Sequence, residues 1–282
     1  MPDYNYYPGH MTKAKRMMEE DIRIIDLMIE LLDARAPMST RNPEIDKLCA
    51  GKARMVLLNK ADLADENETK KWLSYFKSDG IEAVALDSRS RKGMRDIENA
   101  VKIACREKIE KNKQKGIINR PMRAMVAGIP NVGKSTFINS YAGRAVAKTG
   151  NKPGVTKGKQ WIRMGKNLEL LDTPGILWPK IEDKEAGYRL ALLGSMNDMI
   201  INTDEMVQKF LTETMDKYPE ILYNTYGINA EMGPVEMIRK VAVVRNALKK
   251  GGEPDLEKAV SFILDDFRSG KLGKITLDSC GR

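Results

Sequence analysis

Short apolar segments alternate with segments of helical pattern along the first 172 residues of the chain. A strand is expected at each of the apolar segments 27–33, 54–58, 81–86, 123–127, 161–164 and 168–171. Helical patterns lie between most of them, over 41–48, 66–78, 94–114 and 136–142. Strands that alternate with helices predict an α/β fold, here a mostly parallel six-stranded sheet with helices on both faces.

The pattern becomes purely helical after residue 175. Apolar residues recur at spacings of three and four over 204–215, 235–248 and 256–267. We therefore expect two domains, an α/β domain over residues 1–178 and a small all-α domain over 179–282. The near-neutral charge of the second domain leaves two roles open for it, RNA contact through a local basic face or a helical module for protein interaction.

Composition narrows the class of protein. Hydrophobic residues make up 42% and charged residues 31%, with no apolar run of membrane-spanning length and no signal-peptide pattern. The three cysteines have neither metal-site spacing nor an even count for disulfides. These features predict a cytoplasmic protein with reduced thiols and no membrane association.

The net charge of +9 is unevenly distributed. Between Lys111 and Leu168 the chain has thirteen basic residues and no acidic one. A solvated surface is one interpretation of this stretch. A surface that faces a polyanion is the better one, and RNA is the leading candidate.

The segment 128–136 fits the phosphate-binding pattern G-x-x-x-x-G-K-[ST] between an expected strand and an expected helix. Backbone N–H groups of such a loop and the helix N-terminus face the phosphates. Lys134 would reach the β- and γ-phosphates, and the Ser135 hydroxyl would hold Mg²⁺. A chance match is the alternative, which the strand–loop–helix context disfavours. The expected nucleotide contacts here are Asn131, Val132, Gly133, Lys134, Ser135 and Thr136.

A base-reading loop is expected after the second strand, where Asn59, Lys60 and Asp62 form Asn-Lys-x-Asp. The Asp62 carboxylate can accept hydrogen bonds from the guanine N1–H and 2-amino groups, a donor pair that adenine lacks. Asn59 would take the other edge of the base, and the Lys60 stem would lie along the ring. A solvated loop is the alternative for this tetrapeptide alone.

The remaining nucleotide loops have weaker signals. Asp87 and Ser88 follow the third strand, where backbone groups can support a base. Thr156, in a Gly- and Lys-rich segment, could close over Mg²⁺ and the γ-phosphate. Asp172-Thr-Pro-Gly175 follows the last strand, so Asp172 would hold Mg²⁺ through water and the Gly175 N–H would sense the γ-phosphate.

The order of these loops is unusual, because base-reading loops come first, the phosphate loop next and Asp172-Thr-Pro-Gly175 last. Joining the ends of a standard GTPase domain and cutting it after Asp-x-x-Gly gives this order. Such a circular permutation is tolerated because domain termini tend to lie close together. Residues after Gly175 would then follow directly from the γ-phosphate loop and could transmit the nucleotide state.

These motifs, together with Asp33-Ala-Arg35, Pro8-Gly-His-Met11 and Gly251-Gly252, resemble the circularly permuted ribosome-biogenesis GTPase A family (YlqF/RbgA-like). The resemblance spans nearly the whole chain. It implies a GTPase that binds late precursors of the large ribosomal subunit, hydrolyses GTP when that particle stimulates it, and then leaves. It also implies contact with rRNA and ribosomal proteins, a C-terminal RNA-binding domain, and a monomer off the ribosome.

The resemblance also proposes a catalytic residue. Ile176 stands where many GTPases have a water-orienting Gln, and an isoleucine cannot orient water. His10, the only histidine of the chain, matches the family's candidate for this task. The alternative is a histidine that contacts RNA or packs on Tyr6 and Tyr7.

Asn131 in the phosphate loop has two interpretations. Its side-chain oxygen could help to hold K⁺ beside the phosphates, as in related potassium-activated GTPases. It could instead be a turn residue that bonds its own loop.

Two further functional hypotheses compete with an assembly GTPase. One is a nucleotide-gated RNA-binding scaffold in which hydrolysis is incidental. The other is a P-loop ATPase, against which the Asn59-Lys-Ala-Asp62 segment argues.

Overall fold

The computed structural model describes residues 16–49, 51–118, 120–145, 161–165, 167–173, 181, 183–196 and 202–281. The chain divides into two compact units. An α/β unit contains residues 4–187 and 276–282, and a helical unit contains residues 188–275. The sequence instead predicted a boundary after residue 178, with all later residues in the helical domain. The helical unit is thus an insertion between two segments of the α/β unit.

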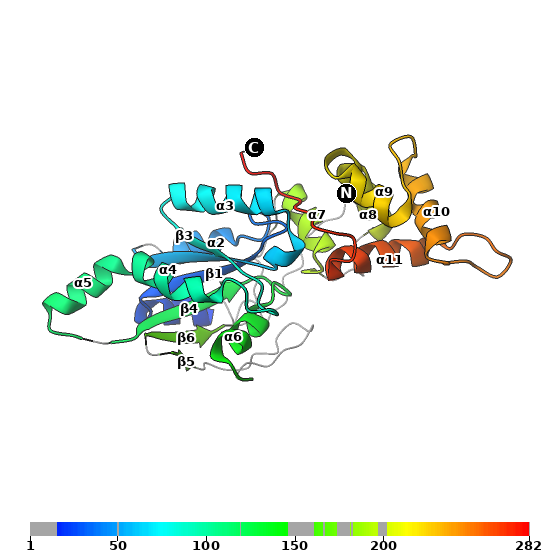
Figure 1. Ribbon diagram of the computed structural model, residues 1–282. Coiled ribbons are helices and arrows are strands. Elements are labelled where there is room, and N and C mark those ends of the chain that lie inside the picture. Colours follow the sequence, from blue (N-terminus) through cyan, green and yellow to red (C-terminus); the bar gives the residue numbers. More distant parts are fainter. Residues whose placement is uncertain are drawn as a thin grey trace. The chain divides into compact units, whose positions relative to one another are not determined.

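One six-stranded sheet forms the centre of the α/β unit, in the order β3-β2-β1-β4-β6-β5 (Figure 1). The strands are β1 (Leu27–Asp33), β2 (Ala53–Asn59), β3 (Glu82–Ala85), β4 (Met122–Gly128), β5 (Trp161–Met164) and β6 (Leu168–Asp172). All neighbouring pairs are parallel except β5 with β6. This order confirms the predicted α/β fold and explains how the permuted chain builds it. The strand β1, from the start of the chain, pairs with β4, whose end carries the phosphate loop.

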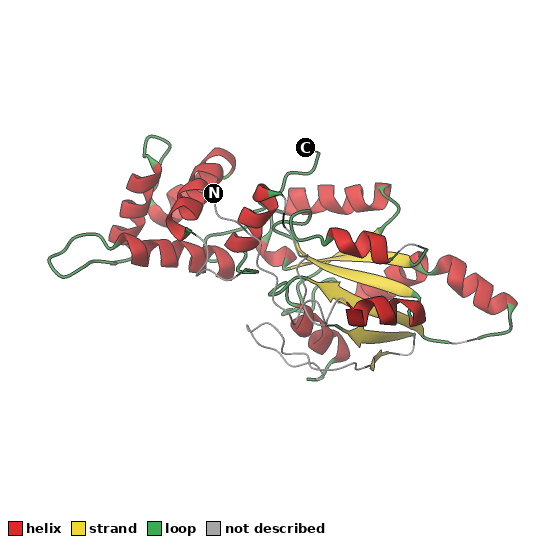
Figure 2. Ribbon diagram, turned by 180° about the vertical axis from the view of Figure 1, so that it is seen from behind, coloured by secondary structure: helices red, strands yellow, loops and turns green. Residues whose placement is uncertain are grey.

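Burial explains why β1 has no alternating pattern. All seven of its residues are buried, because it lies between β2 and β4 with helices on both faces of the sheet (Figures 1 and 2). Such strands form continuous apolar runs. Its carboxyl end is aligned with the end of β2, and Asp33 is opposite Asn59 in the register. The polar residues that follow both strands are therefore brought to one edge.

The helices of the α/β unit include α2 (Pro43–Leu48), α3 (Glu66–Ser78), α4 (Ile97–Ala104), α5 (Arg106–Gln114) and α6 (Lys134–Ala142). From α3, Trp72 and Phe76 pack on Leu32, Val56 and Leu58 of the sheet. The Asp65 side chain caps the N-terminus of α3 by accepting from the N–H groups of residues 67 and 68.

The single long helix expected over 94–114 is wrong. The segment forms a 3-10 turn (Met94–Asp96), then α4 and α5, which meet at the buried Cys105. Ile97, Ala100 and Val101 give α4 a buried apolar face, whereas Asn112 is the buried residue of α5. The helix is interrupted because the Cys105 backbone (φ −98°, ψ 12°) departs from helical values. The mostly charged α5 has no apolar stripe to continue along the sheet.

The helical unit is built from α8 (Thr203–Lys217), α9 (Pro219–Tyr226), α10 (Pro234–Val244) and α11 (Leu256–Ser269), and α7 (Lys184–Leu192) spans the division. The rings of Phe210 and Phe267 pack 4.8 Å apart in its core. The buried Asp266 carboxylate accepts hydrogen bonds from the Tyr226 hydroxyl and the Arg245 guanidinium. No helix in the described part of the chain is long and apolar enough to span a membrane.

Candidate guanine-nucleotide site

The phosphate loop joins β4 to α6 in the expected strand–loop–helix arrangement. Gly133 has φ +95°, and a Cβ atom on it would lie 2.5 Å from the Nδ2 atom of Asn59. At Gly128 a Cβ would lie 2.9 Å from the carbonyl oxygen of Leu31. The approach of β1 therefore requires a glycine at 128. The approach of the base-reading loop requires one at 133, where the left-handed backbone favours glycine as well.

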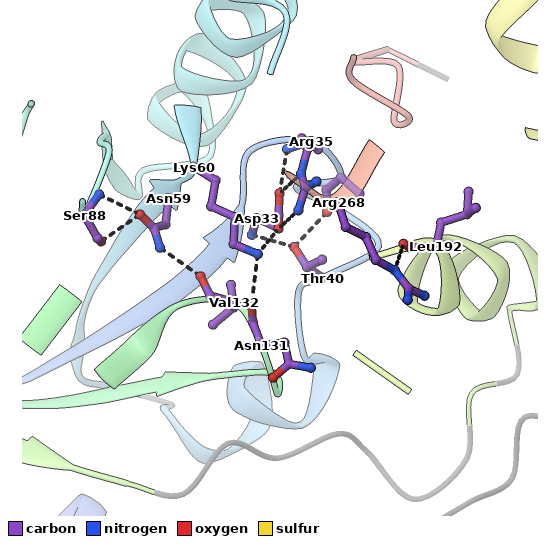
Figure 3. Close-up of polar contacts among 11 residues, drawn as sticks. Asp33, Arg35, Thr40, Asn59, Lys60, Ser88, Asn131, Val132, Leu192 and Arg268 are labelled. Carbon is purple, nitrogen blue, oxygen red and sulfur yellow. Dashed lines mark hydrogen bonds and ion pairs between the residues drawn. The ribbon is translucent and has the colours of Figure 1, made fainter. Parts of the chain in front are cut away.

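Asn59 joins three loops (Figure 3). Its Nδ2 group donates to the carbonyl oxygen of Val132 at 2.8 Å. Its Oδ1 atom accepts from the backbone N–H of Ser88 at 3.1 Å and from the Ser88 hydroxyl at 2.7 Å. The structure thus places Asn59 and Ser88 together beside the phosphate loop and gives Asn59 a loop-organising role. A direct contact of Asn59 with a base stays a prediction.

Lys60 lies across the phosphate loop in a left-handed backbone conformation (φ +59°). Its Nζ atom donates to the carbonyl oxygen of Asn131 at 2.8 Å and lies 2.9 Å from the Oδ2 atom of Asp33 (Figure 3). Burial lowers the pKa of Lys60, and the Asp33 carboxylate opposes that shift. The stem of Lys60 is thereby fixed between two loops, where it can form one wall of a base-binding site.

Asp33 and Arg35 form a buried ion pair that supports Lys60. The Arg35 guanidinium donates to Asp33 Oδ1 at 2.9 Å and to Oδ2 at 2.8 Å, and each residue is 1% exposed. Burial alone would raise the pKa of Asp33, but the adjacent charges of Arg35 and Lys60 hold it far below its usual range. In the sequence, Asp33 and Arg35 stand out only through the family resemblance. Their position at the end of β1, next to the base-reading strand β2, is the feature that indicates a supporting role.

Asp62 is exposed in a short 3-10 helix (Ala61–Leu63) directly after Lys60. Partial desolvation of its carboxyl group by the surrounding loops raises its pKa, and the Asp87 carboxylate adds to the shift. Two charge-assisted donors, such as those of guanine, would relieve this unfavourable environment. Asp87 itself accepts from the backbone N–H groups of Arg89 and Ser90, so it organises its own loop.

The phosphate side of the site contains a buried ion pair between Lys134 and Asp172. Lys134 begins α6, and Asp172 ends β6. The Thr173 hydroxyl donates to the carbonyl oxygen of Val126 at 2.7 Å and so attaches the chain after β6 to the phosphate-loop strand. The two ionic groups expected to face the phosphates and their cation therefore lie together.

The donor set fits Mg²⁺. The Ser135 hydroxyl lies in the first turn of α6, and the Asp172 carboxylate lies at the adjacent strand end. Among the described residues no group of three or more His, Cys, Asp or Glu side chains could hold a metal. A small set of protein ligands suits Mg²⁺, which takes much of its coordination from water and phosphates. Thr136, the next residue of α6, lies beside Ser135.

Three expected site residues, His10, Thr156 and Gly175, lie outside the described residues. The site observed here therefore comprises the phosphate loop, the two base-side loops and the end of β6.

Comparisons with known proteins agree with this geometry. A family model described as "50S ribosome-binding GTPase" matches residues 123–230. The chain is 46% identical to the ribosome biogenesis GTPase A of Bacillus cereus, over 97% of this chain and 93% of that protein. It is 32% identical to the Thermotoga maritima protein of the same name, over 97% and 94%.

A solved structure has the same fold. The GNP-bound structure of YlqF from T. maritima has a TM-score of 0.65 at 30% identity, with 95% of this chain and 99% of that chain covered. The guanine-nucleotide loops and the near-complete coverage lead to one conclusion. The chain is a GTPase and belongs to the ribosome biogenesis GTPase A family.

Proposed function

We propose that this GTPase binds late precursors of the large ribosomal subunit and leaves them after ribosome-stimulated GTP hydrolysis. The observation that carries the proposal is the joined set of guanine loops, in which Asn59 and Lys60 bind the phosphate loop through Val132 and Asn131. This site occurs in a chain whose relatives carry the name ribosome biogenesis GTPase A over nearly their full length.

The basic surface supports an RNA partner. Lys113 and Lys115, near the end of α5, are exposed within the acid-free stretch that follows Glu110. Such a surface neutralises phosphates, so its affinity for RNA falls as salt rises. The proposed partners are therefore rRNA and ribosomal proteins of the precursor, with the helical unit, residues 188–275, as an RNA-binding domain. A ribosomal partner would place the protein in the cytoplasm.

The roles of the site residues follow from their positions. Asp62 would accept from the guanine N1–H and 2-amino groups, and Asn59, Lys60, Asp87 and Ser88 would hold the loops around the base. Val132, Gly133 and Thr136 would present backbone N–H groups to the phosphates. Lys134 would exchange its Asp172 partner for phosphate oxygens. Ser135, Asp172 and Thr156 would hold Mg²⁺, which neutralises charge that develops on the phosphates.

Hydrolysis requires a group that orients water, and we assign this role to His10. The side chain of Ile176 has no polar atom for the task. Gly175 would report the γ-phosphate to the chain that follows it, which leads into α7 and the helical unit. Loss of the γ-phosphate could therefore change how the helical unit binds its partner.

Asn131 is the proposed K⁺ ligand. Its backbone is left-handed (φ +62°), and its carbonyl oxygen already accepts from Lys60. Turnover measured in KCl and in NaCl at equal ionic strength tests this role, and K⁺ should give the higher rate. Equal rates would leave Asn131 as a turn residue.

The decisive experiment measures GTP turnover by the full chain in K⁺ buffer, alone and with purified large or small subunits. Strong stimulation by large subunits only is the expected result. Tight GTP binding without stimulation would contradict the proposal. That result would favour the alternative, a nucleotide-gated RNA-binding scaffold with incidental hydrolysis.

A further inference from the structure

Residues 276–280 return to the α/β unit and bind the loop that follows β1. The Asp278 carboxylate accepts from the Ser39 backbone N–H and from the Ser39 hydroxyl, both at 2.8 Å. The Leu277 N–H donates to the carbonyl oxygen of Arg35 at 2.6 Å. Asp278 is 2% exposed and Ser39 is 6% exposed, so this contact is shielded from water.

The same segment also binds the start of α3. The Thr276 hydroxyl accepts from the backbone N–H of Asp65, the N-cap residue of α3, at 2.9 Å. Cys280 packs against the apolar cluster that contains Trp72 and Phe76. The segment therefore contacts the chain on both sides of the base-reading loop, before it through residues 35–39 and after it through residue 65.

A continuous set of contacts leads from this segment to the nucleotide loops. Arg35, whose carbonyl oxygen accepts from Leu277, holds the Asp33 carboxylate through two hydrogen bonds. Asp33 in turn lies 2.9 Å from Lys60 Nζ, which donates to the Asn131 carbonyl oxygen of the phosphate loop (Figure 3). The links through Arg35 and Asp33 are buried, and the last one, from Lys60 to Asn131, reaches the exposed surface of the phosphate loop.

The loop itself is under strong constraint. The Asp33 N–H donates to the Thr40 hydroxyl at 3.1 Å, and that hydroxyl donates to the Ala36 carbonyl oxygen at 2.7 Å. The two hydrogen bonds that Ser39 donates to Asp278 fix Ser39, the neighbour of Thr40. Removing Asp278 leaves the buried Ser39 N–H and hydroxyl without these acceptors, which is costly unless the loop shifts. A shift of this loop would move Asp33 and release Lys60.

We propose that Asp278 is a positioning residue for guanine-nucleotide binding, acting through Ser39, the Arg35–Asp33 ion pair and Lys60. It touches no nucleotide in this role. It holds the residues that fix Lys60 across the phosphate loop. A buried ion pair adds little net stability on its own. The main effect of the Arg35–Asp33 pair is therefore on the geometry of the site.

The test compares dissociation of a fluorescent (mant) GDP from the wild-type chain and from Asp278→Ala. The expected result is a dissociation rate about tenfold higher, the scale of one lost hydrogen bond to a charged group. A fluorescent non-hydrolysable GTP analogue should show the same factor, because base and ribose are common to both ligands. Ser39→Ala, which keeps the Ser39 N–H bond, should give a smaller increase and provides a milder variant if Asp278→Ala does not fold.

The matched control is Asp255→Ala in the helical unit. The Asp255 side chain also accepts from a backbone N–H, as the N-cap of α11. It should lower the melting temperature without changing nucleotide dissociation. The proposal is overturned if the dissociation rates of Asp278→Ala and Ser39→Ala stay within twofold of wild type, whether or not their melting temperatures fall.

Discussion

The side chain of Asn59 donates to the carbonyl oxygen of Val132 at 2.8 Å and so fastens the base-reading loop directly to the phosphate loop. These residues are separated by 73 positions in the chain. Their contact explains how base recognition and phosphate binding form one site although the permuted chain reaches them in reverse order. It also requires a glycine beside it, at Gly133.

Replacement of Gly133 by alanine should abolish nucleotide binding. The new Cβ would lie 2.5 Å from Asn59 Nδ2, and the residue would keep an unfavourable φ of +95°. Gly116→Ala is the matched control, because Gly116 has φ +70° but nothing within 4 Å of an added Cβ. Titration with fluorescent GDP should show binding by the control and at least about a hundredfold loss in Gly133→Ala. Similar affinities of both variants for GDP would show that a Cβ atom at position 133 does not disturb the site.

Asp62→Asn should change base preference from guanine to xanthine. The amide cannot accept from both guanine donors, but it can donate to the 2-oxo group of xanthine. Loss of two charge-assisted hydrogen bonds predicts a GDP affinity about a hundredfold lower. Competition binding with GDP, XDP and ADP measures the preference. Unchanged GDP affinity would mean that Asp62 does not contact the base.

His10→Ala should leave GTP affinity unchanged and lower particle-stimulated hydrolysis by about 10²-fold, the lower end for a positioned group. Single-turnover hydrolysis with saturating large subunits measures this step. Tyr6→Ala is a useful companion, since a histidine that packs on Tyr6 would make the two variants behave alike. Full stimulated turnover by His10→Ala would exclude a catalytic role for His10.

Glu30 should make the free energy of unfolding depend on pH. This side chain is 2% exposed in the middle of β1, and burial raises its pKa to about 7 despite the Asn42 N–H bond and the nearby Arg41 and Arg54. The unfolded chain loses this proton near pH 4.5, whereas the folded chain keeps it to about pH 7. Stability should therefore fall as pH rises across this window, by at most about 3 kcal/mol.

Glu30→Gln isolates this effect. The glutamine keeps an acceptor for the Asn42 N–H and has no proton to lose. Urea unfolding of both proteins between pH 5 and 8 should show the wild type losing stability relative to the variant up to about pH 7, with a constant difference above it. Parallel pH profiles would show that Glu30 titrates normally.

The α/β fold, the permuted order of the loops and the identity of the nucleotide-binding segments could all be predicted from the sequence. This was possible because each loop follows a parallel strand, and parallel strands bring their carboxyl ends to one edge of a sheet. Asn59, Lys134 and Asp172 could therefore be assigned to one site before any distance was known.

The contacts that hold these loops together became known only from the folded structure. The contact of Ser39 with Asp278 joins residues 239 positions apart, and the expected boundary had placed residue 278 in the helical domain. The break at Cys105 could not be predicted from the sequence either, since the sequence pattern of 94–114 is continuously helical. Periodicity reports local conformation and burial, whereas a hydrogen bond between distant residues depends on where the folded chain brings a donor to an acceptor.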